Sequence, residues 1–150
     1  MKILVTGAAG YLGSVLCPRF AEAGYEVIAV DLESPPRIFL EQPGIEYHSG
    51  DVLDESLMRP LIQRADVIVP LAALVGTPLC AREPEQAWAV NLGGIRLIQK
   101  MRASGQSVIF PMTNNGYTPA PGQAYATEET PMQALSVYTQ SKQQAEKELF

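Results

Sequence analysis

The sequence predicts an α/β protein in which a doubly wound parallel sheet carries helices on both faces. Short, almost wholly apolar runs alternate along the chain with longer stretches whose apolar residues recur at helical spacing. Strands that are apolar throughout are typical of a parallel sheet that helices cover on both sides. The 150 residues are 47% hydrophobic and 18% charged, which is the composition of a globular protein and suits one domain, residues 1–150.

The first half of the chain predicts three strands and two helices. A short apolar run ends at Gly7, and the helical pattern that follows ends before Gly24, with Pro18 as a point where the helix could kink. Asp54 is a residue type that caps helices, so a helix is expected to begin there. In order, the elements are a strand over 2–6, a helix over 11–23, strands over 26–30 and 45–48, and a helix from 54 to about 64, with a proline-rich connection over 35–43.

The second half predicts two more strands and two more helices. They are a strand over 66–71, a long helix over 84–103 that closes near Gly105, a strand over 107–111, a loop over 114–131 and a helix over 136–150. A sheet of this kind binds ligands at the carboxyl ends of its strands, near the point beside the first strand where the strand order reverses.

A glycine-rich turn joins the first strand to the first helix. The spacing is Gly-x-x-Gly-x-x-Gly: the first glycine permits a tight turn, the second lets a diphosphate approach the backbone, and the third allows close contact between helix and strand. The diphosphate would lie against the N–H groups at the start of the helix. Glycines are also common in such turns for structural reasons alone, so the turn by itself leaves both interpretations open. The predicted contacts are Gly7, Ala9, Gly10, Tyr11, Leu12 and Gly13.

An acidic residue at the end of the second strand favours the cofactor interpretation. Asp31 stands eighteen residues after Gly13, where its carboxylate can accept hydrogen bonds from the adenosine ribose of a dinucleotide. The same carboxylate repels a 2′-phosphate, and Leu32 follows it in place of a basic residue, so we predict NAD rather than NADP. Arg37, further along the proline-rich connection, could weaken that preference.

Two further segments are predicted to reach the cofactor. Asp51 either accepts a hydrogen bond from the adenine amino group or helps to start the next helix, and Val52 would pack on the adenine ring. The residues that close the fourth strand, Leu71, Ala72 and Ala73, let a backbone approach the cofactor, although packing alone would favour the same small residues.

A tyrosine and a lysine in the last predicted helix suggest acid–base chemistry. Tyr138 and Lys142 are four residues apart and therefore share one face of the helix. A free phenol loses its proton near about pH 10, and a nearby ammonium and a bound nicotinium both favour the phenolate. Lys142 can also hold the nicotinamide ribose, and Thr113, at the end of the fifth strand, is the candidate that fixes the substrate oxygen.

These motifs together resemble the extended short-chain dehydrogenase/reductase superfamily and, within it, the NAD-dependent epimerase/dehydratase family, which acts largely on nucleotide sugars. The resemblance covers essentially the whole chain and implies a Rossmann-like fold, NAD as cofactor, Tyr138 as the catalytic acid/base, Lys142 as its electrostatic partner and Thr113 as the third member of the triad. Thr113 stands twenty-five residues before Tyr138 and four before Tyr117, as in the family. The resemblance also implies that Asn91 supports the active site, often through a water relay.

The activity that this resemblance implies is oxidation of a substrate hydroxyl to a keto intermediate by an epimerase of sugar nucleotides. Two alternatives remain: a net NAD-dependent dehydrogenase or reductase of another hydroxy substrate, and a dinucleotide-binding fragment without catalysis. Sugar 4,6-dehydratases carry Asp-Glu directly after the threonine, whereas this chain has Asn114 and Asn115. Amide side chains cannot serve as acid or base, so dehydration is disfavoured.

The resemblance also predicts more chain and a second copy. Family members are about twice as long, and the part that grips the nucleotide sugar follows the tyrosine–lysine helix, which here runs to Phe150 without a stop signal. We therefore expect residues 1–150 to be the N-terminal part of a longer enzyme, cut before the last strands and the substrate-binding subdomain. A homodimer is expected through the helices near 84–103 and 136–150.

The composition of the chain disfavours several classes of partner. Sixteen Asp and Glu against eleven Lys and Arg give a net charge of −5, which disfavours binding to nucleic acid. The longest apolar run, residues 67–75, is too short to span a bilayer, and Cys17 and Cys80 suggest no disulfide framework, so we expect a cytoplasmic protein. The single histidine, His48, leaves little material for a metal centre, and no metal is predicted.

Overall fold

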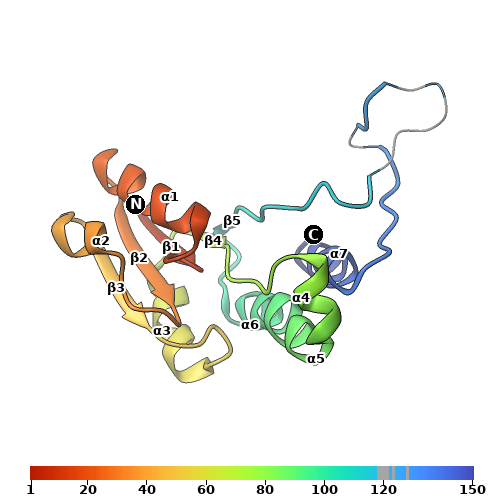
Figure 1. The fold of residues 1–150 in the computed structure, drawn as a ribbon. Helices are drawn as coiled ribbons and strands as arrows, with labels where there is room; N and C mark the ends of the chain where they lie inside the picture. Colours follow the sequence, from red (N-terminus) through yellow and green to blue (C-terminus); the bar gives the residue numbers. More distant parts are fainter. Residues whose placement is uncertain (118–121, 123, 128) are drawn as a thin grey trace.

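A five-stranded parallel sheet forms the centre of the computed structural model, which describes residues 1–150 except 118–121, 123 and 128 (Figure 1). The strand order is β3-β2-β1-β4-β5, so the chain builds outward from β1 in one direction and then in the other. This arrangement confirms the predicted doubly wound, Rossmann-like sheet. The strands are β1 (Lys2–Thr6), β2 (Glu26–Asp31), β3 (Ile45–Ser49), β4 (Val67–Pro70) and β5 (Ser107–Val108).

Alternating side chains of β1 divide the core into two clusters, because successive residues of a strand point to opposite faces. Leu4 packs with side chains of α3, α6 and α7, whereas Ile3 and Val5 pack with those of α1 and α2 on the other face. The helices are α1 (Tyr11–Glu22), α2 (Arg37–Glu41), α3 (Glu55–Arg64), α4 (Thr77–Arg82), α5 (Pro84–Trp88), the π-helical turn η1 (Ala89–Gly93), α6 (Gly94–Met101) and α7 (Val137–Leu149).

Several elements differ from the sequence-based prediction. The helix expected over 84–103 is a succession of α5, η1 and α6, in which the π-helical turn precedes the Gly93–Gly94 junction. Two short helices, α2 and α4, were not predicted, since each is only one or two turns long and begins beside a proline, which reads as a loop signal. The fifth strand is shorter than expected: β5 covers two residues at the edge of the sheet, where it pairs with β4.

The other predicted elements agree with the structure to within one or two residues. Asp54 caps α3 as expected, with its carboxylate accepting from the N–H groups of Ser56 and Leu57 at 2.9 and 3.2 Å. Pro18 is accommodated inside α1. Part of the loop expected over 114–131 (residues 118–121, 123 and 128) lies outside the described residues. No helix in the described part of the chain combines the length and apolar character needed to cross a membrane.

Candidate active site

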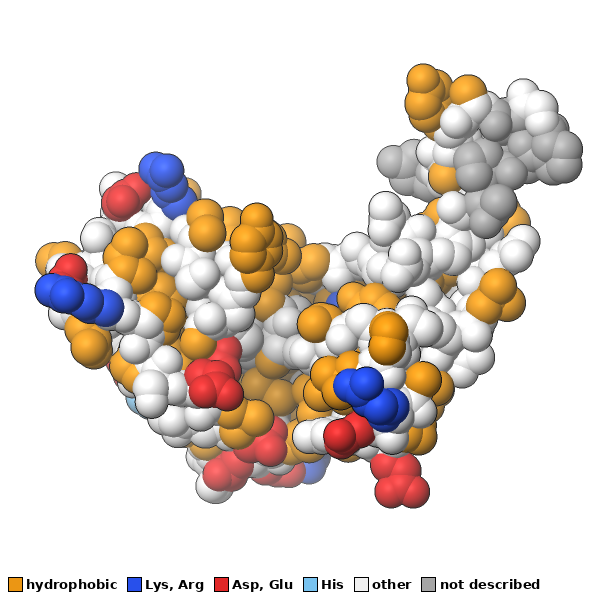
Figure 2. All heavy atoms as spheres, in the orientation of Figure 1, with side chains coloured by type: hydrophobic (Ala, Val, Ile, Leu, Met, Phe, Trp, Pro, Cys, Tyr) orange, Lys and Arg blue, Asp and Glu red, His pale blue; other side chains and the backbone are white. Residues whose placement is uncertain are grey.

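A pocket of about 550 Å³ opens at the carboxyl ends of β1, β2 and β4, where the strand order reverses. Figure 2 shows the surface hollowed between the part that carries α1 and β2 and the part that carries α4 and α5. The pocket has the position that a doubly wound sheet gives its ligand. It is lined by Gly7, Ala9, Gly10, Tyr11, Leu12, Gly13, Asp31, Leu32, Glu33, Gly50, Asp51, Val52, Pro70, Leu71, Ala72, Ala73, Leu74, Val75, Gln86, Val90, Pro111, Met112, Thr113, Tyr138 and Lys142.

The glycine turn is packed so closely that two of its glycines, Gly7 and Gly13, have no room for a side chain. Gly7 has a left-handed backbone (φ 69°), and a Cβ at this position would lie 2.6 Å from the backbone nitrogen of Ala72. A Cβ on Gly13 would collide with the Gly7 carbonyl oxygen and with Ala8. The turn can therefore bring its backbone directly against the end of β4, which forms the floor of the pocket.

The first turn of α1 offers backbone donors to the pocket. The N-cap residue, Gly10, has no side chain to accept a hydrogen bond, and the first helical hydrogen bond runs from the Ser14 N–H to the Gly10 carbonyl at 2.9 Å. The N–H groups of residues 11–13 precede that bond and have no acceptor within the helix. Such a helix start favours an anion, so this part of the pocket fits the diphosphate of a dinucleotide.

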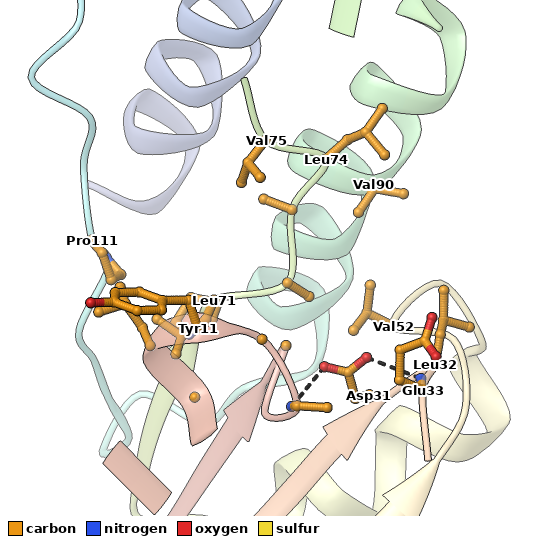
Figure 3. A pocket seen from close by; sticks show the side chains of 18 of the residues that line it. Tyr11, Asp31, Leu32, Glu33, Val52, Leu71, Leu74, Val75, Val90 and Pro111 are labelled. Carbon is orange, nitrogen blue, oxygen red and sulfur yellow. Dashed lines mark hydrogen bonds between the residues drawn. The ribbon is translucent and has the colours of Figure 1, made fainter. Parts of the chain in front are cut away.

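Asp31 connects the glycine turn to the end of β2. Its carboxylate accepts hydrogen bonds from the N–H of Ala9 at 2.8 Å and from the N–H of Glu33 at 3.1 Å (Figure 3). Arg37, which could have weakened the preference for NAD, is absent from the pocket lining in the described residues, and its guanidinium pairs with Glu41 at 2.6 Å. Arg37 therefore does not pair with Asp31 in the pocket.

Asp51 and Val52, the two predicted adenine contacts, both line the pocket. The Asp51 carboxylate accepts from the N–H of Leu53 at 2.9 Å and so shapes the turn before α3, whereas the cap of that helix is Asp54. Val52 is buried at the pocket wall. Asp51 thus combines a place at the pocket with a role in the turn, and neither of its two predicted roles excludes the other.

The segment of residues 71–76, which we call the wall segment, continues from β4 along the pocket. Thr6 holds its first two residues: the Leu71 N–H donates to the Thr6 carbonyl at 3.0 Å, and the Ala72 N–H donates to Thr6 Oγ1 at 3.3 Å. Leu71, Ala72 and Ala73, which were predicted to let the backbone approach the cofactor, all line the pocket.

Thr113, Tyr138 and Lys142 come together in this same pocket from two distant parts of the sequence. Tyr138 and Lys142 lie on α7, whose start is fixed by a capping box between Ser136 and Thr139. Only 6% of Lys142 is exposed, and its Nζ lies 3.7 Å from the centroid of the Phe110 ring. Burial lowers the pKa of the Lys142 ammonium to about 8, and the charge of Glu146 opposes that shift.

Asn91 lies behind the wall segment and is absent from the described pocket lining. Its Oδ1 accepts from the Leu74 N–H at 2.7 Å, and its Nδ2 donates to the Leu74 carbonyl and to Ser141 Oγ, both at 3.1 Å. The structure therefore places Asn91 in a supporting position, through direct hydrogen bonds to the wall segment and to α7.

Several lining residues were not predicted, among them Glu33, Leu74, Val75, Gln86 and Val90. Gln86 and Val90 are four residues apart, so their common helical face could have been recognised had one of them been assigned to the site. Residues 74–76 of the wall segment have no recognisable local motif, and their path depends on distant residues such as Asn91. In the described part of the chain, no group of three or more His, Cys, Asp or Glu side chains could hold a metal ion.

The two cysteines and the histidine are absent from the described pocket lining, although Cys80 Sγ donates to the carbonyl of the lining residue Leu74 at 3.2 Å. Cys17 and Cys80 are buried and unpaired with each other, and burial raises the pKa of the Cys17 thiol to about 12. His48 Nε2 lies 2.7 Å from a carboxylate oxygen of Glu46 on β3, outside the described pocket lining.

Known proteins of one enzyme family match nearly the full length of this chain. Residues 3–150 match the model of the NAD dependent epimerase/dehydratase family. A UDP-glucose 4-epimerase of Streptomyces lividans is 32% identical over 146 residues, which cover 94% of this chain and 44% of that protein.

Solved structures of similar enzymes superpose on the same region. The UDP-glucose 4-epimerase of Bifidobacterium longum, in complex with NAD⁺ and UDP, has a TM-score of 0.85 at 27% identity and covers 98% of this chain and 47% of its own. The enzyme of Thermotoga maritima, with UDP-glucose, has a TM-score of 0.86 at 26% identity and covers 99% of this chain and 50% of its own. The chain thus spans about half the length of the relatives it matches. The match over residues 3–150 shows that the chain belongs to the NAD dependent epimerase/dehydratase family of enzymes.

Proposed function

We propose that this protein is an NAD-dependent epimerase of nucleotide sugars, and that residues 1–150 form its cofactor-binding domain. The observation that carries the proposal is the convergence of the glycine turn, Asp31 and the group Thr113, Tyr138 and Lys142 on one pocket. The first two lie within the first 31 residues and the others beyond residue 112, so the fold brings a dinucleotide cradle next to acid–base side chains. The relatives named as UDP-glucose 4-epimerases support a nucleotide sugar as the substrate class.

The residues of the pocket fit NAD along its whole length. The N–H groups at the start of α1 would hold the diphosphate, Asp31 the adenosine ribose and Val52 the adenine. Lys142, at the opposite side of the pocket, would hold the nicotinamide ribose. When bound, NAD supplies the acceptor for a hydride from the substrate, and an epimerase returns that hydride within the same cycle.

The chain's own side chains would then handle the proton. Tyr138 Oη takes the proton from the substrate hydroxyl and gives it back at the end of the cycle. Thr113 Oγ1 hydrogen-bonds the same substrate oxygen as charge develops on it. The Lys142 ammonium stabilises the phenolate form of Tyr138, and with a pKa of about 8 it is mostly charged at neutral pH.

The replacement Tyr138→Phe tests this assignment. It should lower kcat for the interconversion of UDP-glucose and its C4 epimer by about 10²–10⁴-fold, because the acid/base is lost, while calorimetry finds unchanged NAD affinity. Unchanged turnover in Tyr138→Phe would refute the role of the tyrosine. In the unmodified enzyme, NAD that stays bound and is not consumed supports the epimerase, whereas stoichiometric release of NADH identifies a net dehydrogenase.

We also propose a homodimer through the helices near 84–103 and 136–150. In the structure these are α5, η1, α6 and α7, which pack against one another on one side of the sheet. A second copy that adds the same helices would extend this packing into a larger helical bundle.

A further inference from the structure

Ser141 is fully buried directly behind the catalytic face of α7 and uses its hydroxyl in two directions. Its Oγ donates to the Tyr138 carbonyl at 2.9 Å, one turn earlier in the helix, and accepts from Asn91 Nδ2 at 3.1 Å. The second contact crosses from α7 to η1 and is made between two polar side chains that are both out of water. A buried bond of this kind is costly to lose, because neither side chain can turn to solvent for a new partner.

Asn91 extends the contact to the wall of the pocket. The same amide that binds Ser141 holds both the N–H and the carbonyl of Leu74. Leu74 lines the pocket, so one amide joins the wall segment on one side to α7 on the other. The π-helical turn that carries Asn91 is a widened turn, a feature often found at functional sites.

The position of Ser141 on α7 determines what this connection controls. At about 100° per residue, Lys142 and Tyr138 lie about 100° and about 60° around the helix from Ser141, on the same side of it. A rotation of α7 that breaks the contact between Ser141 and Asn91 would therefore turn both side chains together relative to the pocket. A further polar contact of α7, the exposed ion pair between Arg96 of α6 and Glu148, lies at the far end of the helix.

We propose that Ser141 is a positioning residue, which through its hydrogen bond to Asn91 fixes the rotation of α7 and so directs Tyr138 and Lys142 into the pocket. The catalytic meaning of this role rests on the function proposed above. The placement itself does not, and it can be measured without cofactor.

The test follows the titration of Lys142 and the protection of the wall segment. The chain has four lysines, and ¹³Cε-lysine NMR with Lys142→Arg for assignment reports the Lys142 ammonium alone. In Ser141→Ala, a loosened α7 lets water reach Lys142, and its titration midpoint should rise by about one pH unit. The Leu74 amide should exchange with solvent about tenfold faster, because Asn91 no longer has both of its neighbours.

Two further variants separate positioning from general stability. Ser136→Ala makes the same substitution at the start of the same helix and removes its cap, so it should lower the melting temperature without shifting the Lys142 titration. Ser141→Thr keeps the hydroxyl and should restore the titration of the unmodified protein. Ser141→Cys keeps the volume with a weaker donor, and it should shift the titration in the same direction as Ser141→Ala if the alanine variant does not fold.

The inference is overturned if Ser141→Ala, or Ser141→Cys in its place, leaves the Lys142 titration and the Leu74 amide unchanged. An equal shift in Ser136→Ala overturns it as well. In the active enzyme, Ser141→Ala should lower kcat by about tenfold with little change in KM, since substrate binding is retained and the acid/base is misplaced. A protein that fails to bind NAD while Ser141→Ala shifts Lys142 as expected would contradict the proposed function and support the positioning role.

Discussion

Lys142 is a cation that the fold keeps almost out of water. Its Nζ lies over the face of Phe110, a favourable but weak contact for a buried charge. The pKa of about 8 shows that burial outweighs the opposing charge of Glu146. A residue retained at such a cost is typical of a functional site, where stability is given up for chemistry.

Replacing this lysine should stabilise the protein while removing activity. The lowered pKa means that the unfolded chain binds the proton more tightly than the folded one. The contribution of Lys142 to the free energy of unfolding therefore rises from pH 8 to about 10.5, and is lowest below pH 8. The full difference is on the order of 3 kcal/mol.

We expect Lys142→Met to unfold at a higher urea concentration than the unmodified protein at pH 7, and this gain to shrink between pH 8 and 10.5. Urea unfolding at several pH values measures both effects. Lys142→Arg, which keeps the charge, is the matched control and should show no gain at pH 7. A methionine variant that is less stable at pH 7 contradicts the assignment of Lys142 as a costly buried cation.

At the scale of one element, the glycine turn separates two reasons for a glycine. One is a left-handed backbone, and the other is close contact with a second segment of the chain. Gly7 and Gly24 both have left-handed backbones, with φ of 69° and 84°. A Cβ on Gly24 meets nothing within 4 Å, whereas one on Gly7 would press into the backbone of the wall segment. Alanine at either position carries a similar backbone strain, but only at Gly7 must a second segment move.

The pair Gly7→Ala and Gly24→Ala therefore isolates the contact between the turn and the wall. Gly24→Ala should lose about 1–2 kcal/mol of stability and keep its NAD affinity. Gly7→Ala should bind NAD at least about tenfold more weakly, because the pocket floor is displaced. Calorimetric titration with NAD and thermal unfolding measure the two effects, and equal NAD affinities in the two variants would show that the close approach is unimportant for the site.

How far each element could be predicted depends on whether its signal is local. The central strands were predictable because burial on both faces requires continuous apolar runs such as Lys2–Thr6. Asp54 and Gly24 mark the ends of helices by their residue type. The Asp54 carboxylate caps the start of α3, and Gly24 adopts a left-handed backbone after the end of α1. The π-helical turn was not predicted, because residues 84–103 were assigned to one continuous α-helix. The turn packs against α7, which is distant in the sequence.

The same distinction holds for the site. Four of the lining residues belong to short motifs with fixed spacing, and these motifs predicted a common site. They are Gly7, Asp31, Tyr138 and Lys142. The role of Ser141 depends on Asn91, fifty residues away, and on Leu74, which belongs to no short motif. Contacts of this kind become visible only when the chain has been folded.

At the scale of the whole molecule, the layer formed by α5, α6 and α7 provides the surface for the proposed dimer. Sedimentation velocity over a range of protein concentrations should give a homodimer. The helices α5, α6 and α7 pack together in one layer, and the same helices of a second copy can pack against that layer. A monomer at all concentrations would contradict the proposed interface while leaving the pocket, which opens at the carboxyl ends of the strands, unaffected.

The central position of β1 has a consequence for biosynthesis. β1, the middle strand of the sheet, is synthesised before both of its neighbours, and one of its two edges stays unpaired until Val67–Pro70 follows and pairs with it. During that interval a strand that is apolar on both faces has no second neighbour. Nascent chains that end before β4 should accordingly depend on chaperones that shield exposed strands, and β1 gains its second neighbour only after β4 has emerged.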